Sequence, residues 1–208
     1  MSLYGRIFAR YYDRAMQATE DAGIRDRRRA LVSRADGRVL EIGAGTGLNV
    51  PLYPEHGFSE LVLTEPEEPM ARRLEERIEE LPMTARVVRT PAEDLPFEDA
   101  TFDTVVSTLV LCTVTDQPAA LREVRRVLKS DGRLLFLEHV RSDDPRQAKW
   151  QDRLHRPWRA IGHGCNCNRA TVPAIEAAGF RLVDLEHGTV PNAPKIVEPL
   201  AIGVAVPA

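Results

Sequence analysis

The chain has 208 residues, of which 43% are hydrophobic, and a formal net charge of −3 at pH 7. This length and composition suit one globular domain, and the small net charge gives no general attraction to nucleic acid or to an anionic membrane. Three cysteines are too few for a disulfide framework, which favours a reducing cytoplasm. There is no signal-peptide pattern and no run near the roughly 20 apolar residues of a membrane span. We therefore expect a cytoplasmic protein and leave peripheral membrane contact open.

Strand-like and helix-like segments alternate along most of the chain. Residues 1–30 are expected to form a helical arm, because Leu3, Ile7, Phe8 and Tyr11 have the spacing of one helix face. Apolar runs then predict five strands, at residues 38–43, 60–65, 85–90, 102–110 and 133–140. Helical spacing predicts helices over residues 67–81 and 117–132, the second ending in a glycine-containing turn at residues 130–132. This alternation predicts an α/β fold with a parallel, doubly wound sheet.

Two regions break the alternation: the N-terminal arm and the polar and aromatic segment 141–169. The second follows the fifth strand and is expected to act as a lid-like insertion. Beyond it, the pattern predicts a helix around 172–178 and strands around 180–187 and 196–206. No linker divides the chain, so residues 1–208 are expected to form a single domain.

A glycine-rich turn follows the first predicted strand in the stretch VLEIGAGTGLN, residues 39–49. Such a turn before a helix lets a ligand approach the backbone and its free N–H groups. The glycines are Gly43, Gly45 and Gly47, whereas a dinucleotide fingerprint would need its third glycine at the position of Leu48. Glu41 would also repel a diphosphate. The turn therefore favours a ligand with a cationic head, such as S-adenosylmethionine, over NAD and an oxidoreductase function.

The second predicted strand ends in Glu65, about twenty residues after the glycine turn. An acid at this place can accept hydrogen bonds from ribose hydroxyls. Each feature alone is weak, but together the turn, Glu41 and Glu65 favour a bound nucleoside over a purely structural turn.

The stretch E-I-G-A-G-T-G, residues 41–47, resembles the first motif of the class I S-adenosylmethionine-dependent methyltransferases. Three later stretches agree with that family, at residues 90–103, 107–116 and 121–139, and the similarity runs from about residue 38 to the C-terminus. The resemblance implies a Rossmann-like sheet of seven strands, mostly parallel, with an antiparallel last strand. It also implies S-adenosylmethionine as the cofactor and S-adenosylhomocysteine as its product.

The resemblance assigns the cofactor-binding residues one by one. The methionine end would be surrounded by Glu41, Gly43, Ala44, Gly45 and Gly47, the ribose held by Glu65, the adenine bordered by Pro66, Met70, Ala92 and Glu93, and the methyl group bordered by Thr108 and Leu109. Pro91 stands where many members have an aspartate. Either Glu93 or Asp94 is therefore expected to reach the adenine amine.

Several acceptor classes are disfavoured by the sequence. The chain lacks the N/D-P-P-Y/F stretch of many nucleic-acid amino-methyltransferases, and it has no basic stripe with interleaved aromatics. The arginines at residues 25–30 are interpreted as a solvated face. We therefore expect a small-molecule acceptor and no nucleic-acid partner.

The acceptor pocket is expected above the carboxyl ends of the strands, where doubly wound sheets bind ligands. The arm, the fourth-strand loop and the insertion would supply aromatic, apolar and a few polar side chains, namely Tyr11, Tyr12, Leu111, Cys112, Trp158, His163 and Cys165. Such a lining suits a small, largely apolar acceptor.

Five short stretches are similar to the mammalian microsomal thiol S-methyltransferases. They are STLVLCTV at 107–114, EHV at 138–140, PW at 157–158, GCN at 164–166 together with Arg169, and P-x-x-x-x-I-V-x-P at 191–199. This resemblance implies a thiol acceptor, although those relatives carry an apolar N-terminal membrane anchor, which we do not expect in this chain. Bacterial aminophospholipid N-methyltransferases and quinone-ring C-methyltransferases resemble the first half nearly as well, including ARYYD at 9–13.

The expected reaction is an in-line displacement at the sulfonium methyl, in which alignment and exclusion of water supply most of the catalysis. A thiol with a pKa of about 8.5 needs only a modest base. His139, after the fifth strand, is the candidate base, and Asn166 would orient the acceptor.

Two further readings stay open. The stretch HGCNCN, 163–168, has the residue types of a soft-metal or metalloid site, which leaves arsenic methylation as a minor alternative. We expect packed structural thiols and no metal there. The other reading is a protein that binds S-adenosylmethionine without turnover, as a sensor or an assembly factor. The sequence leaves the oligomeric state open.

Overall fold

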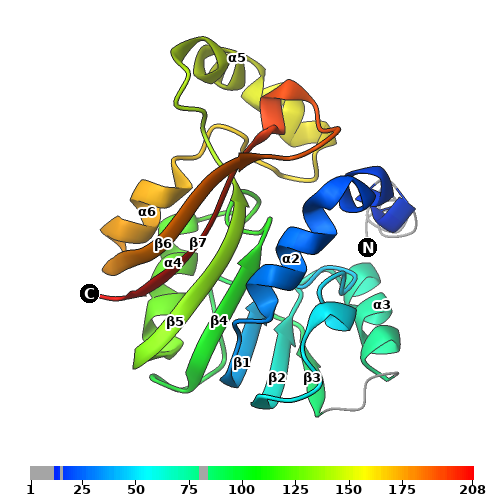
Figure 1. Cartoon of the computed structure of the whole chain (residues 1–208), viewed down its shortest axis with the longest axis vertical. Coiled ribbons are helices and arrows are strands. Elements are labelled where there is room, and N and C mark those ends of the chain that lie inside the picture. Colours follow the sequence, from blue (N-terminus) through cyan, green and yellow to red (C-terminus); the bar gives the residue numbers. More distant parts are fainter. Residues whose placement is uncertain (1–11, 15, 80–83) are drawn as a thin grey trace.

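The computed structural model describes residues 12–14, 16–79 and 84–208. Its centre is a 7-stranded sheet in the order β3-β2-β1-β4-β5-β7-β6 (Figure 1). The strands are β1 Gly37–Ile42, β2 Phe58–Thr64, β3 Ala85–Val88, β4 Phe102–Thr108, β5 Leu128–His139, β6 Phe180–Thr189 and β7 Pro199–Pro207. Strands β1 to β5 pair in parallel, and β7 is antiparallel to both β5 and β6. The expected sheet with an antiparallel last strand is confirmed.

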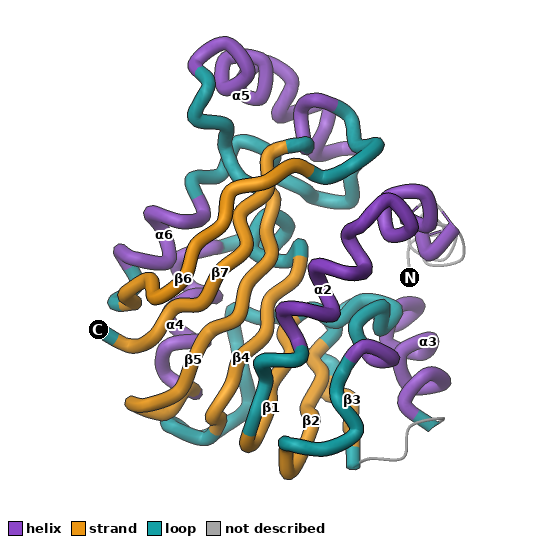
Figure 2. Tube along the Cα trace, in the orientation of Figure 1, coloured by secondary structure: helices purple, strands orange, loops and turns teal. Residues whose placement is uncertain are grey.

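Helices cover both faces of this sheet (Figure 2). One face carries η1 Glu20–Ile24, α2 Arg25–Val32 and α3 Glu68–Ile78, and the other carries α4 Gln117–Val127 and α6 Thr171–Ala177. Alternate residues of β5 enter the two cores: Leu134 and Phe136 pack on the α4 face, and Leu135 and Leu137 on the α2 face. Burial on both faces explains why the strands read as near-continuous apolar runs.

The boundary between α4 and β5 differs from the expectation. The helix ends at Val127 and the strand begins at Leu128, so the glycine turn expected at residues 130–132 is wrong. Gly132 is outside the left-handed region, and a Cβ on it would lie 2.8 Å from the Asp103 carbonyl oxygen. The glycine is therefore needed for the close approach of β5 to β4 and does not end a helix.

The segment 141–169 contains a helix that the pattern did not predict, α5 Pro145–Ile161, which stands beyond the end of the sheet (Figure 1). Buried Gln151 anchors it. Its Nε2 donates to the carbonyl oxygens of Val140 at 3.1 Å, Cys167 at 2.8 Å and Ile196 at 3.1 Å. No helix in the described part of the chain is long and apolar enough to cross a membrane.

The N-terminal arm is described only from residue 12 onward, and it is helical at residues 12–14 and 16–32. The four apolar positions on which its helical expectation rests, Leu3, Ile7, Phe8 and Tyr11, lie outside the described residues. The short helices η2 Val50–Leu52 and η3 Lys195–Val197 complete the fold.

Candidate active site

The glycine loop lies between β1 and η2, at the carboxyl ends of the parallel strands (Figure 1). Gly43, Gly45 and Gly47 all have positive φ, at 56°, 60° and 85°. A Cβ added to Gly43 would lie 2.6 Å from the Val110 side chain, and one added to Gly47 would lie 2.7 Å from the Leu74 side chain. Nothing lies within 4 Å of a Cβ added to Gly45. Two glycines are thus required by packing, and Gly45 alone faces open space that a ligand can fill.

Glu65 lies beside this loop, directly after β2. Its Oε2 accepts the backbone N–H of Gly45 at 2.9 Å, and its Oε1 accepts that of Glu67 at 2.8 Å. The residue is buried, and burial raises its pKa to about 7. Each carboxylate oxygen keeps a second lone pair, which a ribose hydroxyl can use.

Glu41 lies under the loop and is only 2% exposed. Its Oε1 accepts a hydrogen bond from Asn49 Nδ2 at 2.9 Å, and its Oε2 accepts one from the Tyr53 hydroxyl at 2.8 Å. Burial raises the pKa of Glu41 to about 7, although both hydrogen bonds act in the opposite direction. The acid expected to face a cationic ligand is therefore already held by two neutral donors.

Arg28 of α2 completes a buried polar network with these groups. Its Nε donates to Glu20 Oε1 at 2.9 Å, and its Nη1 donates to Asn49 Oδ1 at 3.2 Å and Thr108 Oγ1 at 2.8 Å. Asn49 also donates to Thr108 Oγ1 at 2.9 Å. The network links the arm to the glycine loop and to the end of β4.

The interpretation of residues 25–30 as a solvated face is wrong for Arg28, which is 3% exposed. It holds for Arg25 and Arg29, which are exposed. The signal was available, because Arg28 lies four residues after Ile24 and three before Leu31, and all three are buried on one side of the helix. A cation on the apolar face of a helix indicates a buried partner.

The end of β4 brings Thr108 and Leu109 beside the glycine loop. Thr108 is buried and accepts the two hydrogen bonds described above. Leu109 has φ 60°, and its N–H donates to the Leu137 carbonyl oxygen at 2.7 Å. A left-handed leucine is uncommon, and such strain gathers at functional sites.

The residues expected around the adenine fall into two groups. Met70 and Ala92 are buried and Pro66 is exposed. Glu93 has another partner, because its Oε1 accepts the backbone N–H groups of Thr115 at 2.7 Å and Asp116 at 3.1 Å. Its carboxylate thus fixes the loop before α4.

The arm and the insertion both contact the cofactor cradle, which comprises the glycine loop, Glu65 and the end of β4 together with the adjoining start of α3. Asp13 accepts hydrogen bonds from the Thr46 hydroxyl at 2.6 Å and from Arg77 Nη2 at 2.5 Å, so it ties the arm to the glycine loop and to α3. From the insertion, His163 Nε2 lies 3.7 Å from Glu67 Oε1. Sequence reasoning missed the role of Asp13, although the residue lies in the quoted stretch ARYYD.

Three of the predicted residues gather beyond the ends of β4 and β5. His139 Nδ1 lies 3.9 Å from Cys112 Sγ and 3.7 Å from Cys165 Sγ. The hydrogen bond with Cys112 lowers the pKa of Cys165, with help from His139 and the Trp158 indole, whereas the pKa of Cys112 is raised. Cys165 is thus the thiol of the pair that ionises first.

Asn166 and Arg169 hold this cluster in place. Asn166 Nδ2 donates to the Cys112 carbonyl oxygen at 3.1 Å, and Asn166 Oδ1 lies 2.7 Å from His155 Nε2. Arg169 donates to the Leu111 and Val114 carbonyl oxygens, both at 2.7 Å. The side-chain contacts of Asn166 are therefore with protein groups.

The remaining residues predicted to bind the acceptor do not all lie near His139. Tyr11 lies outside the described residues. Burial raises the pKa of the Tyr12 phenol, and the nearby Arg28 acts in the opposite direction. The Leu111 side chain is fully buried in the core on the α4 face, away from this group.

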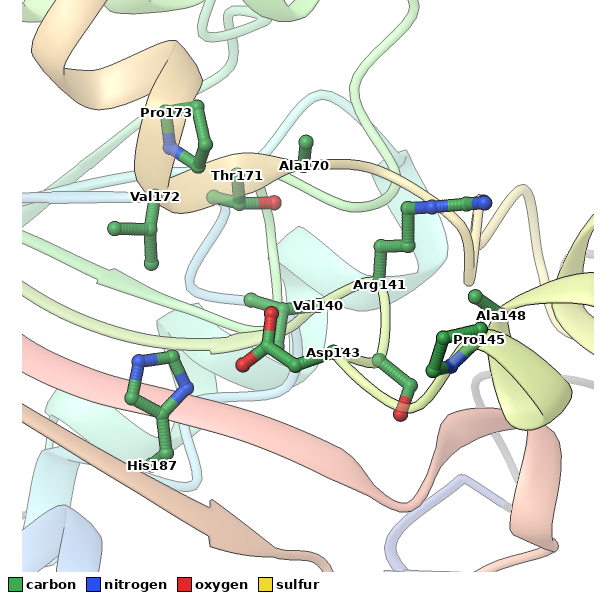
Figure 3. Close-up of a pocket in the computed structure, with 11 residues that line it drawn as sticks. Val140, Arg141, Asp143, Pro145, Ala148, Ala170, Thr171, Val172, Pro173 and His187 are labelled. Atoms are coloured by element: carbon green, nitrogen blue, oxygen red, sulfur yellow. The ribbon is translucent and has the colours of Figure 1, made fainter.

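A separate pocket of about 570 Å³ lies between the start of the insertion and α6. Figure 3 shows Arg141, Asp143, Thr171 and His187 around it, with His187 contributed by β6. None of the residues predicted to bind the acceptor lines this pocket.

Comparisons with known proteins identify the family of the chain. A family model described as a methyltransferase domain matches residues 40–136. The human thiol S-methyltransferase TMT1A is 34% identical over 172 residues, which cover 81% of this chain and 70% of that protein. A phosphatidylethanolamine N-methyltransferase of Cereibacter sphaeroides is 32% identical over 140 residues, 66% of this chain and 68% of that protein.

The fold is shared with solved methyltransferases. The Burkholderia thailandensis 1,6-didemethyltoxoflavin-N1-methyltransferase, solved with bound 1,6-didemethyltoxoflavin and S-adenosylhomocysteine, superposes with a TM-score of 0.66 at 21% identity. The match covers 95% of this chain and 84% of that one. The chain therefore belongs to the class I S-adenosylmethionine-dependent methyltransferases.

Proposed function

We propose that this enzyme transfers the methyl group of S-adenosylmethionine to the sulfur of a small, largely apolar thiol. One observation carries the proposal. The stretches at 107–114, 138–140, 157–158 and 164–169, which resemble thiol S-methyltransferases, are far apart in sequence, yet they meet around His139. The 34% identity over 172 residues to a thiol S-methyltransferase extends this similarity beyond the four stretches.

The cofactor is proposed to lie along the glycine loop. Gly45 leaves the space for it, and Glu65 would accept hydrogen bonds from its ribose hydroxyls. Met70 and Ala92 would border the adenine, and Thr108 and Leu109 the methionine part and the methyl group. Glu41 is proposed to act mainly through Asn49, by holding it against Thr108.

The proposed reaction needs one proton transfer and one displacement. His139 accepts the proton of the acceptor thiol. The thiolate lone pair then attacks the methyl carbon in line, and the bond to the sulfonium breaks so that S-adenosylhomocysteine leaves with its electron pair. The neighbouring Trp158 and the buried Cys165 give an environment with little water, where a thiolate is more nucleophilic.

A second candidate function is N-methylation of an aminophospholipid, favoured by the 32% identity to a phosphatidylethanolamine N-methyltransferase. That reaction needs a lipid headgroup at the site. Methylation of a quinone ring, and cofactor binding without turnover, are the remaining outcomes of the same test.

The test is S-adenosylhomocysteine release by the purified protein with small alkyl and aryl thiols, phosphatidylethanolamine in micelles, and a quinol. We expect turnover with thiols alone. Release with phosphatidylethanolamine alone would replace the thiol function by the second candidate. No release with any acceptor, despite cofactor binding, would contradict both.

A further inference from the structure

We propose that Cys112, His139 and Cys165 form a binding site for one thiophilic divalent cation of the Zn²⁺ type. We also propose that an open coordination position of this ion takes the sulfur of the acceptor. The second statement rests on the proposed function, whereas the first does not.

The three ligand atoms have the spacing that such an ion needs. They lie within 4.8 Å of one another, and the imidazole nitrogen is 3.7 Å and 3.9 Å from the two sulfurs. Zinc bonds of about 2.3 Å to sulfur and about 2.0 Å to nitrogen at tetrahedral angles place nitrogen and sulfur about 3.5 Å apart. The distances from the imidazole nitrogen to the two sulfurs are therefore within a few tenths of an ångström of those that a bound ion requires.

The ligands come from three different elements that are fixed by other bonds. Cys112 lies in the loop after β4, which Asn166 and Arg169 hold through its carbonyl oxygens. His139 is the last residue of β5, and Cys165 follows α5. A site preorganised in this way loses little entropy when the ion binds.

The surroundings favour a soft cation and leave room for a further ligand. Cys112 is 1% exposed and Cys165 is 5% exposed, and they pack with apolar Val197 and Ile196. Two thiolates and one imidazole suit Zn²⁺ better than Mg²⁺ or Ca²⁺. Among the described residues the group has three members, and three protein ligands with an open position are the pattern of catalytic zinc sites.

The open position explains how a thiol acceptor is activated. A thiol that coordinates such a cation loses its proton, which passes to solvent. The resulting thiolate attacks the methyl carbon, and the electron pair of the broken bond remains on S-adenosylhomocysteine. In the ion-loaded enzyme His139 is a ligand, and the ion replaces it as the group that deprotonates the acceptor.

The third cysteine provides a matched control. Cys167 is 0% exposed, and its Sγ donates to the Gln151 carbonyl oxygen at 3.8 Å, outside the three-residue group. Replacing Cys167 by serine therefore tests the loss of a buried thiol without the loss of a ligand.

The experiment is a titration of the full chain with Co²⁺ and then Zn²⁺, in the presence of a phosphine reductant. We expect one equivalent of Co²⁺ with thiolate-to-cobalt absorption, displaced by Zn²⁺. Cys112→Ser, Cys165→Ser and His139→Ala should each weaken binding at least about tenfold, and Cys167→Ser should not. Far-ultraviolet circular dichroism and S-adenosylhomocysteine binding verify that each variant is folded.

Two results would overturn the ion site: wild type that binds no stoichiometric Co²⁺, or folded ligand variants that bind it as well as wild type. Acceptor turnover is read separately. Stoichiometric binding without thiol turnover would leave the ion site standing and contradict the proposed function. Thiol turnover without ion binding would support the proposed function and contradict the ion site.

A second, independent observation concerns the outer face of α5. Trp150, Leu154 and Ile161 are 58%, 39% and 69% exposed, and Pro157 is exposed too. Their spacing of four, three and four residues puts them on one stripe of the helix. Figure 1 shows α5 at the outer end of the molecule, beyond the sheet.

Positive charge accompanies this stripe. Exposed cations lie along the same helix, with Arg146, Lys149 and Arg153 on one side of the stripe, and Arg156 and Arg159 farther round the helix. The single acid of α5, Asp152, is paired with Arg141. Arg153 also lies over the Trp150 ring, 5.9 Å from its centroid. We infer that α5 lies on an anionic lipid surface, because an apolar stripe flanked by cations binds there although the whole chain carries a net charge of −3.

Vesicle sedimentation tests this surface. We expect binding to phosphatidylglycerol vesicles, weakened by salt, and little binding to phosphatidylcholine vesicles. Leu154→Asp should abolish binding, whereas Val183→Asp, at an exposed apolar position on β6, should not. Equal binding of wild type and Leu154→Asp would overturn the inference. A wild-type dimer that Leu154→Asp dissociates, with no vesicle binding, would assign the stripe to a second copy instead.

Discussion

Glu65 is the residue on which cofactor affinity should depend most strongly. Its ionised form would accept the ribose hydroxyls, and burial raises its pKa to about 7 in the ligand-free protein. S-adenosylhomocysteine affinity should therefore be highest above pH 7 and fall as the pH drops below it. Glu65→Ala should weaken binding at pH 8 about tenfold to a hundredfold, since hydrogen bonds to a charged group contribute about 1.5–3 kcal/mol. Calorimetric titration measures both effects, and unchanged affinity in the variant would contradict the cofactor site.

Glu41, although it is expected to support the cofactor site, should lower the folding stability of the ligand-free protein at alkaline pH. Its pKa is about 7 in the folded protein, above its ordinary value of 4.5, so folding opposes its ionisation. The wild type should lose stability from this group as the pH rises from about 5 to 8. Glu41→Gln should remove that loss and stabilise the ligand-free protein at pH 8 by an amount on the order of 1–3 kcal/mol. Melting curves at pH 5 and 8 test this, and an equal difference from wild type at both would contradict it.

The N-terminal part of the fold, η1 and α2, depends on one buried ion pair. Arg28→Ala would leave Glu20 buried without its cation, and such losses destabilise by about 3–5 kcal/mol. For a chain of this size the melting temperature should fall by about 6–20 °C. Arg29→Ala, one residue further along, removes an exposed cation and should change it by at most about 2 °C. Equal shifts in both variants would show that the buried network does not stabilise the arm.

At the scale of elements, most of the sheet followed from the sequence. Apolar runs located the central strands because both faces of the sheet are buried there, whereas the edge strands β3 and β6 are largely half-buried or exposed and were located by their place in the alternation. The α4–β5 boundary was misplaced, because a glycine at position 132 can be required either by a turn or by the close approach of another backbone. Only the position of the Asp103 carbonyl oxygen decides between the two. Helix α5 was missed because its apolar stripe faces solvent and its anchor is the polar Gln151.

At the scale of the whole molecule, the sequence predicted the glycine loop and the acid after β2 through a motif of fixed spacing. It grouped Cys165 with His163 and Cys167, whereas the structure brings Cys165 together with His139 and Cys112. It did not find the contacts between distant elements. Asp13 on the glycine loop and His163 against Glu67 depend on tertiary positions that no local pattern encodes, and for Arg28 the helix spacing indicates burial but not the partners. These contacts bring the arm and the insertion to the glycine loop and to the start and body of α3, where together they would shield the methyl transfer from water.

The most direct test of the thiol assignment is a competition in one reaction. It contains S-adenosylmethionine labelled on its methyl group, a small alkyl thiol and phosphatidylethanolamine in micelles, with products identified by mass spectrometry. We predict label on sulfur only, with Cys167→Ser matching wild type and His139→Ala slowed while its cofactor affinity is retained. Label on the lipid amine, or on neither acceptor, would contradict the proposed function.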